Sequence, residues 1–337
     1  MFTDLVQQSL TGEITTELAL KILNASALPE NAIKLFQVAS RIRDEQLGKT
    51  LWWSAGISGI FPCQLAPRCG YCTFYTDSFF PTEHILQAIK EIEELGLQQL
   101  HLSGGTNLQG YDREILDLVK SIRSVSNIAL EVNLGPSLTM DTVKKLKSLG
   151  VSSITSSLEV SNEELFEKMK PGDSLEARKN LLEFCKKEEM PVRGMMLLGL
   201  GETNEDRIKH LFYLRKFKGL YHLRFSRFYP FSGTECRDLQ RCSPWELART
   251  VAVARLIMPN VQLGLAAGNE SDDIPLWYLA GGGNQLLGVT ASRKAPRISG
   301  QRVKRISDDL FIVDKRSLLE HYVNGMGRKV VHECPKY

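Results

Sequence analysis

The sequence predicts an α/β protein of the (β/α)8 TIM barrel class. Eight short apolar segments recur along the 337 residues, and segments with helical periodicity lie between them. Strict alternation of strand and helix is typical of parallel βαβ units, and eight such units in about 250 residues suit a closed barrel. The content of 43% hydrophobic and 24% charged residues is that of a globular chain with a large core. An open doubly wound sheet is the alternative that this pattern leaves open.

The expected strands are residues 50–60, 97–105, 128–135, 151–160, 191–201, 221–229, 261–268 and 284–289. Apolar residues three or four apart predict helices at 82–96, 139–150, 202–217 and 243–258. Thr82 and Ser243 are the expected N-caps, and Gly96 ends the first of these helices. We expect three parts, namely N-terminal helices packed against the bottom or side of the barrel (1–48), the barrel itself (49–300) and a C-terminal extension packed on it (301–337).

The composition of the chain indicates where in the cell the protein is expected and which kinds of partner it is expected to lack. The net charge of +3 is small and spread out, which gives no sign of a nucleic-acid or membrane surface. No apolar run approaches the roughly 20 residues of a spanning helix, and the first 20 residues lack the apolar core of a signal peptide. We therefore expect a cytoplasmic protein without a nucleic-acid or membrane partner. In that reducing compartment, clustered thiols more often hold metal or do redox work than form disulfides.

Three of the seven cysteines lie within ten positions, in "GIFPCQLAPRCGYCTFY" (59–75), as Cys63, Cys69 and Cys72. This loop follows the first expected strand, and catalytic residues of such barrels collect at the carboxyl ends of the strands. A [4Fe–4S] cluster needs four ligands, normally thiolates, so three protein ligands leave one iron open. Zinc with a histidine as fourth ligand is an alternative, but neither His84 nor His101 has the usual spacing. Three buried cysteines without metal are the other alternative.

The loop resembles the cluster-binding loop of radical S-adenosylmethionine (SAM) enzymes, in which an aromatic residue commonly precedes the last cysteine, as Tyr71 does here. The usual spacing in that family is three residues and then two, whereas this chain has five and then two. Other segments resemble the same family, and biotin synthase in particular: "LSGGTN" (102–107), "SSLEV" (156–160), "SLEARKNLLEF" (174–184), "MMLLGLGET" (195–203) and the closing stretches at 254–271 and 279–289.

The resemblance implies a [4Fe–4S] cluster on the three cysteines with SAM as the fourth ligand. Reductive cleavage of SAM then yields methionine and a 5′-deoxyadenosyl radical for hydrogen abstraction, with the protein binding and aligning the reactants. In these enzymes a glycine-rich stretch contacts the methionine amine, an acid lies near the ribose, an arginine binds the carboxylate and a fifth-strand segment flanks the adenine. The SAM contacts so implied are Tyr71, Gly104, Gly105, Thr106, Asn133, Glu159, Arg178, Met196, Leu198 and Gly199.

Three of these assignments have a structural alternative. The glycines also suit a tight strand–helix turn, Glu159 a helix-capping position and Arg178 a solvated helix surface. Biotin synthase holds a second cluster with cysteines on later strands, but Asn133 stands at one such position and 192–202 has no cysteine. Sulfur insertion from an auxiliary cluster is therefore not expected.

The five-then-two spacing on this type of barrel resembles the radical SAM proteins of [Fe]-hydrogenase (Hmd) cofactor maturation, HmdB or HcgA. This implies a role in making the guanylylpyridinol iron cofactor, from a small-molecule substrate, with an electron donor such as a ferredoxin or flavodoxin and contact with other maturation proteins. HydE-like and PylB-like enzymes are the alternatives on the same barrel. An iron–sulfur carrier or scaffold is the alternative from another class, although three protein ligands speak against a purely structural cluster.

Substrate contacts are expected on the sixth strand and just after it. Alternation places Arg224 and Ser226 on one face and Arg227 and Tyr229 on the other, and the sequence does not say which face points inward. A buried arginine there favours a carboxylate or phosphate on the substrate. A structural ion pair with an acid such as Glu131 is the alternative.

Overall fold

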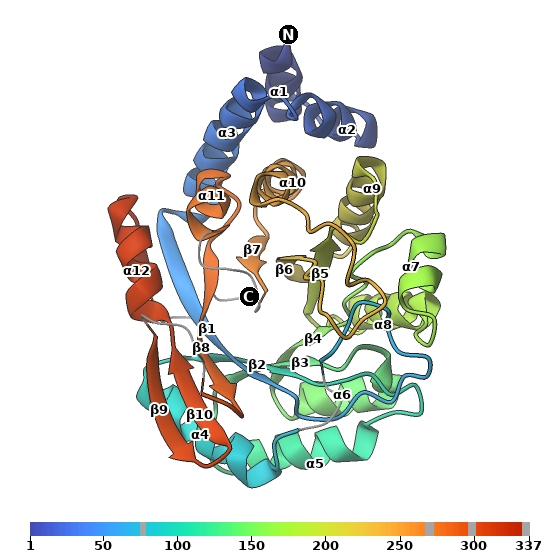
Figure 1. Ribbon diagram of the computed structural model, residues 1–337, viewed down its shortest axis with the longest axis vertical. Helices are drawn as coiled ribbons and strands as arrows, with labels where there is room; N and C mark the ends of the chain where they lie inside the picture. Colours follow the sequence, from blue (N-terminus) through green and yellow to red (C-terminus); the bar gives the residue numbers. More distant parts are fainter. Residues whose placement is uncertain (75–78, 267–272, 296–300, 332–337) are drawn as a thin grey trace.

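The computed structural model describes residues 1–74, 79–266, 273–295 and 301–331. Eight parallel strands follow one another around a barrel (Figure 1). They are β1 (Thr50–Ser58), β2 (Gln99–Ser103), β3 (Ala129–Asn133), β4 (Val151–Thr155), β5 (Val192–Leu198), β6 (Leu220–Arg227), β7 (Gln262–Leu265) and β8 (Gln285–Ser292). Trp52–Ile57 of β1 pair with Gln285–Ala291 of β8, which closes the barrel and excludes the open sheet. All eight expected strands are therefore confirmed.

Helices cover the outside of this barrel. They are α4 (Thr82–Glu94), α5 (Asp112–Arg123), α6 (Met140–Ser148), α7 (Glu163–Met169), α8 (Leu175–Lys187), α9 (Asn204–Arg215), α10 (Pro244–Ile257) and α11 (Asp273–Leu279). Ser243 caps α10 as expected, because its hydroxyl accepts a hydrogen bond of 3.1 Å from the amide of Glu246. The prediction for Thr82 was wrong, since α4 begins at Thr82 itself and its N-cap is Pro81, which makes no side-chain cap.

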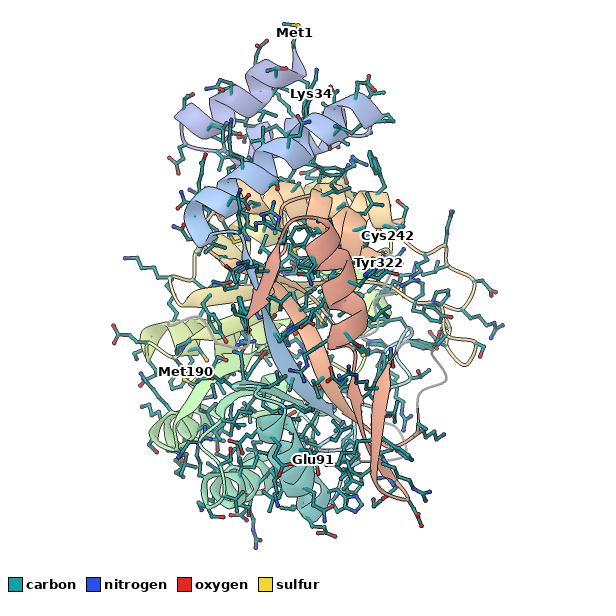
Figure 2. The ribbon with its side chains drawn as sticks, turned by 90° about the vertical axis from the view of Figure 1, so that its left-hand side faces the viewer. Met1, Lys34, Glu91, Met190, Cys242 and Tyr322 are labelled. Atoms are coloured by element: carbon teal, nitrogen blue, oxygen red, sulfur yellow. The ribbon has the colours of Figure 1, made fainter. Side chains whose placement is uncertain are left out.

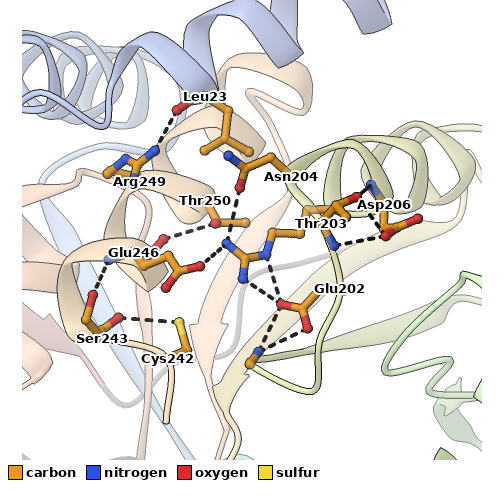
Figure 3. Close-up of polar contacts among 12 residues, drawn as sticks. Leu23, Glu202, Thr203, Asn204, Asp206, Cys242, Ser243, Glu246, Arg249 and Thr250 are labelled. Atoms are coloured by element: carbon orange, nitrogen blue, oxygen red, sulfur yellow. Dashed lines mark hydrogen bonds and ion pairs between the residues drawn. The ribbon is translucent and has the colours of Figure 1, made fainter. Parts of the chain in front are cut away.

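Three N-terminal helices, α1 (Phe2–Thr11), α2 (Thr16–Ala25) and α3 (Pro29–Leu47), form a layer on the side of the barrel. In Figure 1 they lie beyond α9, α10 and α11, and α3 packs on α10 while α2 packs on α9. Figure 2 shows this layer, which carries Met1 and Lys34, at one end of the molecule and Glu91 of α4 toward the other. Arg249 of α10 ties the layer down by donating a 2.7 Å hydrogen bond to the carbonyl of Leu23 (Figure 3).

The last part of the chain extends the sheet. It contains β9 (Arg302–Ser307), β10 (Leu310–Asp314), α12 (Arg316–Gly325) and β11 (Lys329–Val331). Strand β10 pairs antiparallel with β8 and with β9, while β11 pairs in parallel with the first residues of β1. These strands use backbone groups on the barrel that the eight-stranded ring leaves unpaired. No helix within the described ranges has the length and apolar character to cross a membrane.

Candidate active site

A cavity of about 550 Å³ opens among the carboxyl-terminal ends of the barrel strands. Side chains of β2, β3, β4 and β6 line it together with the cysteine loop that follows β1. Most of the residues singled out from the sequence meet here: Cys63, Cys69, Tyr71, Cys72, Gly104, Gly105, Thr106, Asn133, Glu159, Arg178, Arg224, Ser226, Arg227 and Tyr229. Three expected SAM contacts, Met196, Leu198 and Gly199, are not among the lining residues.

The start of the cysteine loop lies directly against the end of β2. The amide of Gly105 donates to the carbonyl of Phe61 at 2.9 Å, and the amide of Gln64 donates to the carbonyl of Thr106 at 2.8 Å. A Cβ on Gly105 would lie 2.3 Å from the Cα of Cys63, well inside any real contact. Only glycine allows this close approach of two backbones. Gly105 therefore has a structural role, which is to position the first cysteine.

The middle of the loop packs on the segment after α7. The amide of Gly70 donates to the carbonyl of Met169 at 2.9 Å, and the amide of Cys236 donates to the carbonyl of Gly70 at 3.0 Å. A Cβ on Gly172 would lie 2.1 Å from the carbonyl oxygen of Pro67, which follows a cis peptide bond. Contacts of Pro67 and Gly70, on either side of Cys69, thus pack the middle of the loop against the end of α7 and the turn that follows it.

The thiols suit a metal cluster. Burial raises the pKa of Cys69 to about 12 and that of Cys72 to about 11, so a bound cation has to displace their protons. Among the described residues, no three His, Cys, Asp or Glu side chains converge closely enough to hold a single ion. A [4Fe–4S] cluster does not need that convergence, since each thiolate binds a different iron. Three thiols of one loop around a shared cavity therefore fit such a cluster.

Beside the cysteines, a buried row of alternating charges crosses the cavity wall. The hydroxyl of Tyr71 donates to Glu159, and the ammonium of Lys170 lies 3.1 Å from Glu159 and 3.0 Å from Asp173. Arg178 completes the row with a 2.7 Å ion pair to Asp173. Burial opposes ionisation of Asp173, but Arg178 and Lys170 outweigh it and hold the pKa of this carboxyl well below its usual range. The four charges are therefore matched in pairs.

The places of Arg178 and Glu159 in this row decide between the alternatives that the sequence left open. Arg178 is buried, with further hydrogen bonds of 2.7 Å to the carbonyl of Ser157 and 3.1 Å to the hydroxyl of Thr106, so it is not a solvated helix residue. Glu159 caps no helix and has a φ of 65°, a left-handed conformation that is rare for glutamate. Backbone strain of this kind is found at ligand sites more often than elsewhere.

The side chains of β5 point the other way from what the sequence analysis expected. Met195 and Leu197 line the cavity, whereas Met196 and Leu198 are buried in the main hydrophobic core. Successive side chains of a strand alternate between faces, so the residues of β5 that face the cavity are one position away from the two expected beside the adenine. Gly199 has a φ of 101° and lies against Cys242, outside the cavity lining.

The turn after β5 is held by Glu202, as Figure 3 shows. Its carboxylate accepts hydrogen bonds of 2.9 Å from the amides of both Gly199 and Leu200, and it forms a 2.6 Å ion pair with Arg207 of α9. Arg207 also lies 2.6 Å from Glu246 of α10. The glutamate of the "GLGE" segment thus joins a strand end to two helices, which is a structural reason for its presence.

Deeper in the barrel, three cationic or imidazole side chains surround one carboxylate. Glu131 of β3 lies 2.5 Å from Arg193, 2.9 Å from His101 and 3.3 Å from Arg224, and accepts a 2.8 Å hydrogen bond from the hydroxyl of Thr155. Burial would raise the pKa of Glu131, but the two arginines outweigh it and hold the pKa well below its usual value. The ion pair with Glu131 that the sequence analysis kept as an alternative therefore exists.

The four expected substrate residues all reach the cavity, from different depths. Arg224 and Ser226 are on the inward face of β6, while Phe225 between them is in the main core. Arg227 donates a 3.0 Å hydrogen bond to the carbonyl of Cys242, and Tyr229 is 47% exposed. Within β6, the face that carries Arg224 and Ser226 therefore points into the barrel.

Lys170 and Asp173 were missed from the sequence. They belong to the short stretch between α7 and α8, where no periodicity marks a functional position. The run "PGD" (171–173), which includes Asp173, predicts a turn. That turn was the one signal in the sequence that could have drawn attention to these two residues. Their importance comes from Glu159 and Arg178, which are brought to them by other elements.

A (β/α)8 barrel that gathers three cysteines of one loop at a cavity over its strand ends defines a barrel enzyme built to hold an iron–sulfur cluster. Comparison with known families agrees: residues 63–214 match the Radical SAM superfamily, and residues 225–290 match the Biotin and Thiamin Synthesis associated domain. The chain belongs to the radical SAM superfamily, in its biotin-synthase-like group. It is therefore a radical SAM enzyme, and its cofactors are a [4Fe–4S] cluster and SAM.

Individual relatives are similar over most of the chain. "Uncharacterized protein MJ0785" of Methanocaldococcus jannaschii is 31% identical over 277 residues, which are 80% of this chain and 73% of the relative. Biotin synthase of Acetivibrio thermocellus is 27% identical over 241 residues, 70% of this chain and 72% of that enzyme.

Solved structures share the fold. Methylornithine synthase (PylB) superposes with a TM-score of 0.79 at 20% identity, covering 97% of each chain. The [FeFe]-hydrogenase maturase HydG from Carboxydothermus hydrogenoformans gives a TM-score of 0.82 at 17% identity, covering 99% of this chain and 80% of the maturase.

Proposed function

We propose that this radical SAM enzyme acts in biosynthesis of the guanylylpyridinol iron cofactor of [Fe]-hydrogenase, in the cytoplasm. The observation that carries the proposal is the spacing of five and then two residues in the cysteine loop. The structure supports this spacing as a built feature, because Pro67 and Gly70 within the loop make close contacts with Gly172 and Met169. Asn133 lines the cavity at a position where biotin synthase is expected to carry a cysteine, which supports a reaction other than sulfur insertion.

The chemistry that the bound cluster and SAM supply is reductive cleavage to methionine and a 5′-deoxyadenosyl radical, with an electron from a donor such as a ferredoxin or flavodoxin. The chain's own residues hold and align the reactants. Cys63, Cys69 and Cys72 would bind the cluster, and the backbone of Gly104 and Gly105 lines the same cavity. Glu159 would meet the ribose hydroxyls and Arg178 the methionine carboxylate, and both side chains line the cavity.

Arg178 can serve the carboxylate only by sharing its charge with Asp173. Its guanidinium already contacts Asp173 through Nε and Nη2, at 3.0 and 2.7 Å. Such a pair holds the guanidinium in one orientation, which lowers the entropy lost when a ligand binds. The walls of the cavity are largely apolar near Leu65, Leu134 and Leu197, which keeps water from a reactive intermediate.

The first test is anaerobic reconstitution with iron and sulfide, followed by EPR of the reduced protein with and without SAM. A [4Fe–4S]⁺ signal that shifts on addition of SAM, together with 5′-deoxyadenosine, is expected. The Cys69→Ala variant should lose SAM cleavage while the barrel stays folded. An unchanged cleavage rate in that variant would contradict the role given to the loop.

The cofactor role is tested separately, in a host that makes [Fe]-hydrogenase and lacks its own HmdB gene. Expression of this chain should restore [Fe]-hydrogenase activity, and expression of Cys69→Ala should not. Failure of the wild-type chain, when it cleaves SAM in vitro and contacts the host's other maturation proteins, would reject the maturation role. Formation of methylornithine would then favour a PylB-like activity. A cluster that is transferred to acceptor proteins without SAM cleavage would favour the carrier alternative.

A further inference from the structure

Lys170 is a buried lysine in the wall of the cavity that holds the cysteines. Only 2% of its side chain is exposed, and its ammonium lies 3.1 Å from Glu159 and 3.0 Å from Asp173. These two carboxylates replace the water that would otherwise solvate the ammonium. The same ammonium lies over the ring of Phe166, 4.9 Å from its centroid, which is a further attractive contact. The charge of Lys170 is therefore held in one place.

The turn that carries Lys170 is attached to the cysteine loop through its backbone. The amide of Gly70 donates a 2.9 Å hydrogen bond to the carbonyl of Met169, the residue before Lys170. A Cβ on Gly172 would lie 2.1 Å from the carbonyl oxygen of Pro67, so the two segments are in direct contact there as well. These two contacts fix the position of the lysine relative to the loop.

Side chains join Lys170 to the two later cysteines. Tyr71 lies between Cys69 and Cys72 in the sequence, and its hydroxyl donates to Glu159, which pairs with Lys170. All of these side chains line the same cavity. Burial raises the pKa of Cys69, and the charge of Lys170 acts against that increase. The field of the ammonium therefore reaches the sulfur of a cluster-binding cysteine.

A charge in this place affects electron transfer to the cluster. One electron from a donor of the ferredoxin or flavodoxin class converts [4Fe–4S]²⁺ to [4Fe–4S]⁺, with no bond made or broken. The site then carries one more negative charge, which a nearby cation stabilises and a nearby carboxylate destabilises. We propose that Lys170 raises the reduction potential of the cluster, and that Glu159 and Asp173 limit this effect. This inference rests on the proposed function only in placing the cluster on the three cysteines.

The size of the effect follows from Coulomb's law. At an effective dielectric constant of about 20, a unit charge about 12 Å away changes a one-electron equilibrium by roughly tenfold. Salt screens a buried charge less than an exposed one, so the effect persists at physiological ionic strength. A substitution of one charged side chain leaves all other charges of the protein in place. The sign of the removed charge therefore sets the direction of the shift.

The test is a redox titration of the reconstituted protein without SAM, with dithionite as the reductant and EPR as the readout. Lys170→Met should lower the ratio of reduced to oxidised cluster at a fixed potential by about tenfold, which is about 59 mV for a one-electron couple. Lys170→Arg keeps the charge and should shift the potential less. Glu159→Gln removes a negative charge and should shift the potential in the opposite direction. Lys209→Met, on α9 where the lysine side chain is 63% exposed, is the control and should leave the potential unchanged.

Opposite shifts for the lysine and the glutamate are the decisive result, because a disturbed site without an electrostatic role would not reverse with the sign of the charge. An unchanged potential in Lys170→Met with wild-type iron content would overturn the proposal, and so would equal shifts in Lys170→Met and Lys170→Arg. If Lys170→Met does not hold the cluster, Glu159→Gln decides, and the absence of a shift toward easier reduction would overturn the proposal.

The titration needs neither SAM nor a substrate, so its outcome is separate from that of the proposed function. Shifts of the expected signs in a chain that fails to restore [Fe]-hydrogenase activity would support the role of Lys170 and count against the maturation role. Restored [Fe]-hydrogenase activity without such shifts would leave the maturation role in place and overturn the role of Lys170.

Discussion

Replacing Gly105 with alanine tests whether this glycine serves the cysteine loop. The added Cβ would lie 2.3 Å from both the Cα and the nitrogen of Cys63, and 2.5 Å from the carbonyl carbon of Pro62. The loop would have to move by roughly 1 Å to reach ordinary van der Waals contact. Overpacking of this kind costs about 1–3 kcal/mol, and the upper end applies because backbone atoms on both sides have to give way.

The assay compares iron bound per chain after anaerobic reconstitution with the free energy of unfolding. Gly105→Ala should bind less iron and unfold more easily, because the displaced atoms belong to the first cysteine. Gly104→Ala should have a smaller effect, since its nearest neighbour, 2.9 Å away, is the end of the Leu134 side chain. Gly233→Ala is the matched control, with no atom within 4 Å of the new Cβ. Wild-type iron content and stability in Gly105→Ala would refute the reasoning.

Three further predictions follow from buried charges. Arg178→Ala should destabilise the fold by about 1–3 kcal/mol, because the buried Asp173 keeps only Lys170, which it shares with Glu159. The same change should weaken SAM binding by roughly 2–5 kcal/mol. Adding Asp173→Asn is expected to restore part of the stability, and unchanged SAM affinity would reject the contact. Glu202→Ala should lower the free energy of unfolding, measured with urea, by about 3–5 kcal/mol, because two amides and the guanidinium of Arg207 lose their acceptor. A decrease below about 1 kcal/mol, which a surface substitution could also cause, would contradict this role. His210 is buried, burial lowers its pKa to about 3, and its Nε2 has no hydrogen-bond partner among the residues that the structure describes. Between about pH 6.5 and 3 this histidine is therefore protonated in the unfolded state but not in the folded state. The free energy of unfolding is highest above pH 6.5 and decreases as the pH falls toward 3, by up to about 1.4 kcal/mol per pH unit. Unfolding between about pH 6 and 4 should show a shallower pH dependence in His210→Gln, and parallel profiles would contradict the assignment.

Several features of this protein could be predicted from short stretches of sequence. The apolar segments at 97–105 and 191–201 contain β2 and β5, and the three cysteines lie at the cavity over the strand ends as expected. Both predictions succeed because they depend on local periodicity and on chain order, and a parallel barrel places every strand end on the same face.

Other features depended on the orientation of a single side chain. The adenine-flanking set was expected at Met196 and Leu198, whereas Met195 and Leu197 line the cavity. A continuous apolar run such as 195–198 is buried on both faces, so its pattern does not reveal which residues point inward. Register against the neighbouring strands decides this, and register is a property of the assembled sheet.

The sequence by itself determined the barrel, the place of the cysteine loop and the superfamily, because those features are carried by residues close together along the chain. Only the tertiary structure decided that Asp173 holds Arg178, that Gly105 makes room for Cys63, and that Arg193 and Arg224 share Glu131. The partners in these contacts come from different strands and loops. Their charges and atoms interact over a few ångströms, a distance that chain folding sets and local sequence does not encode.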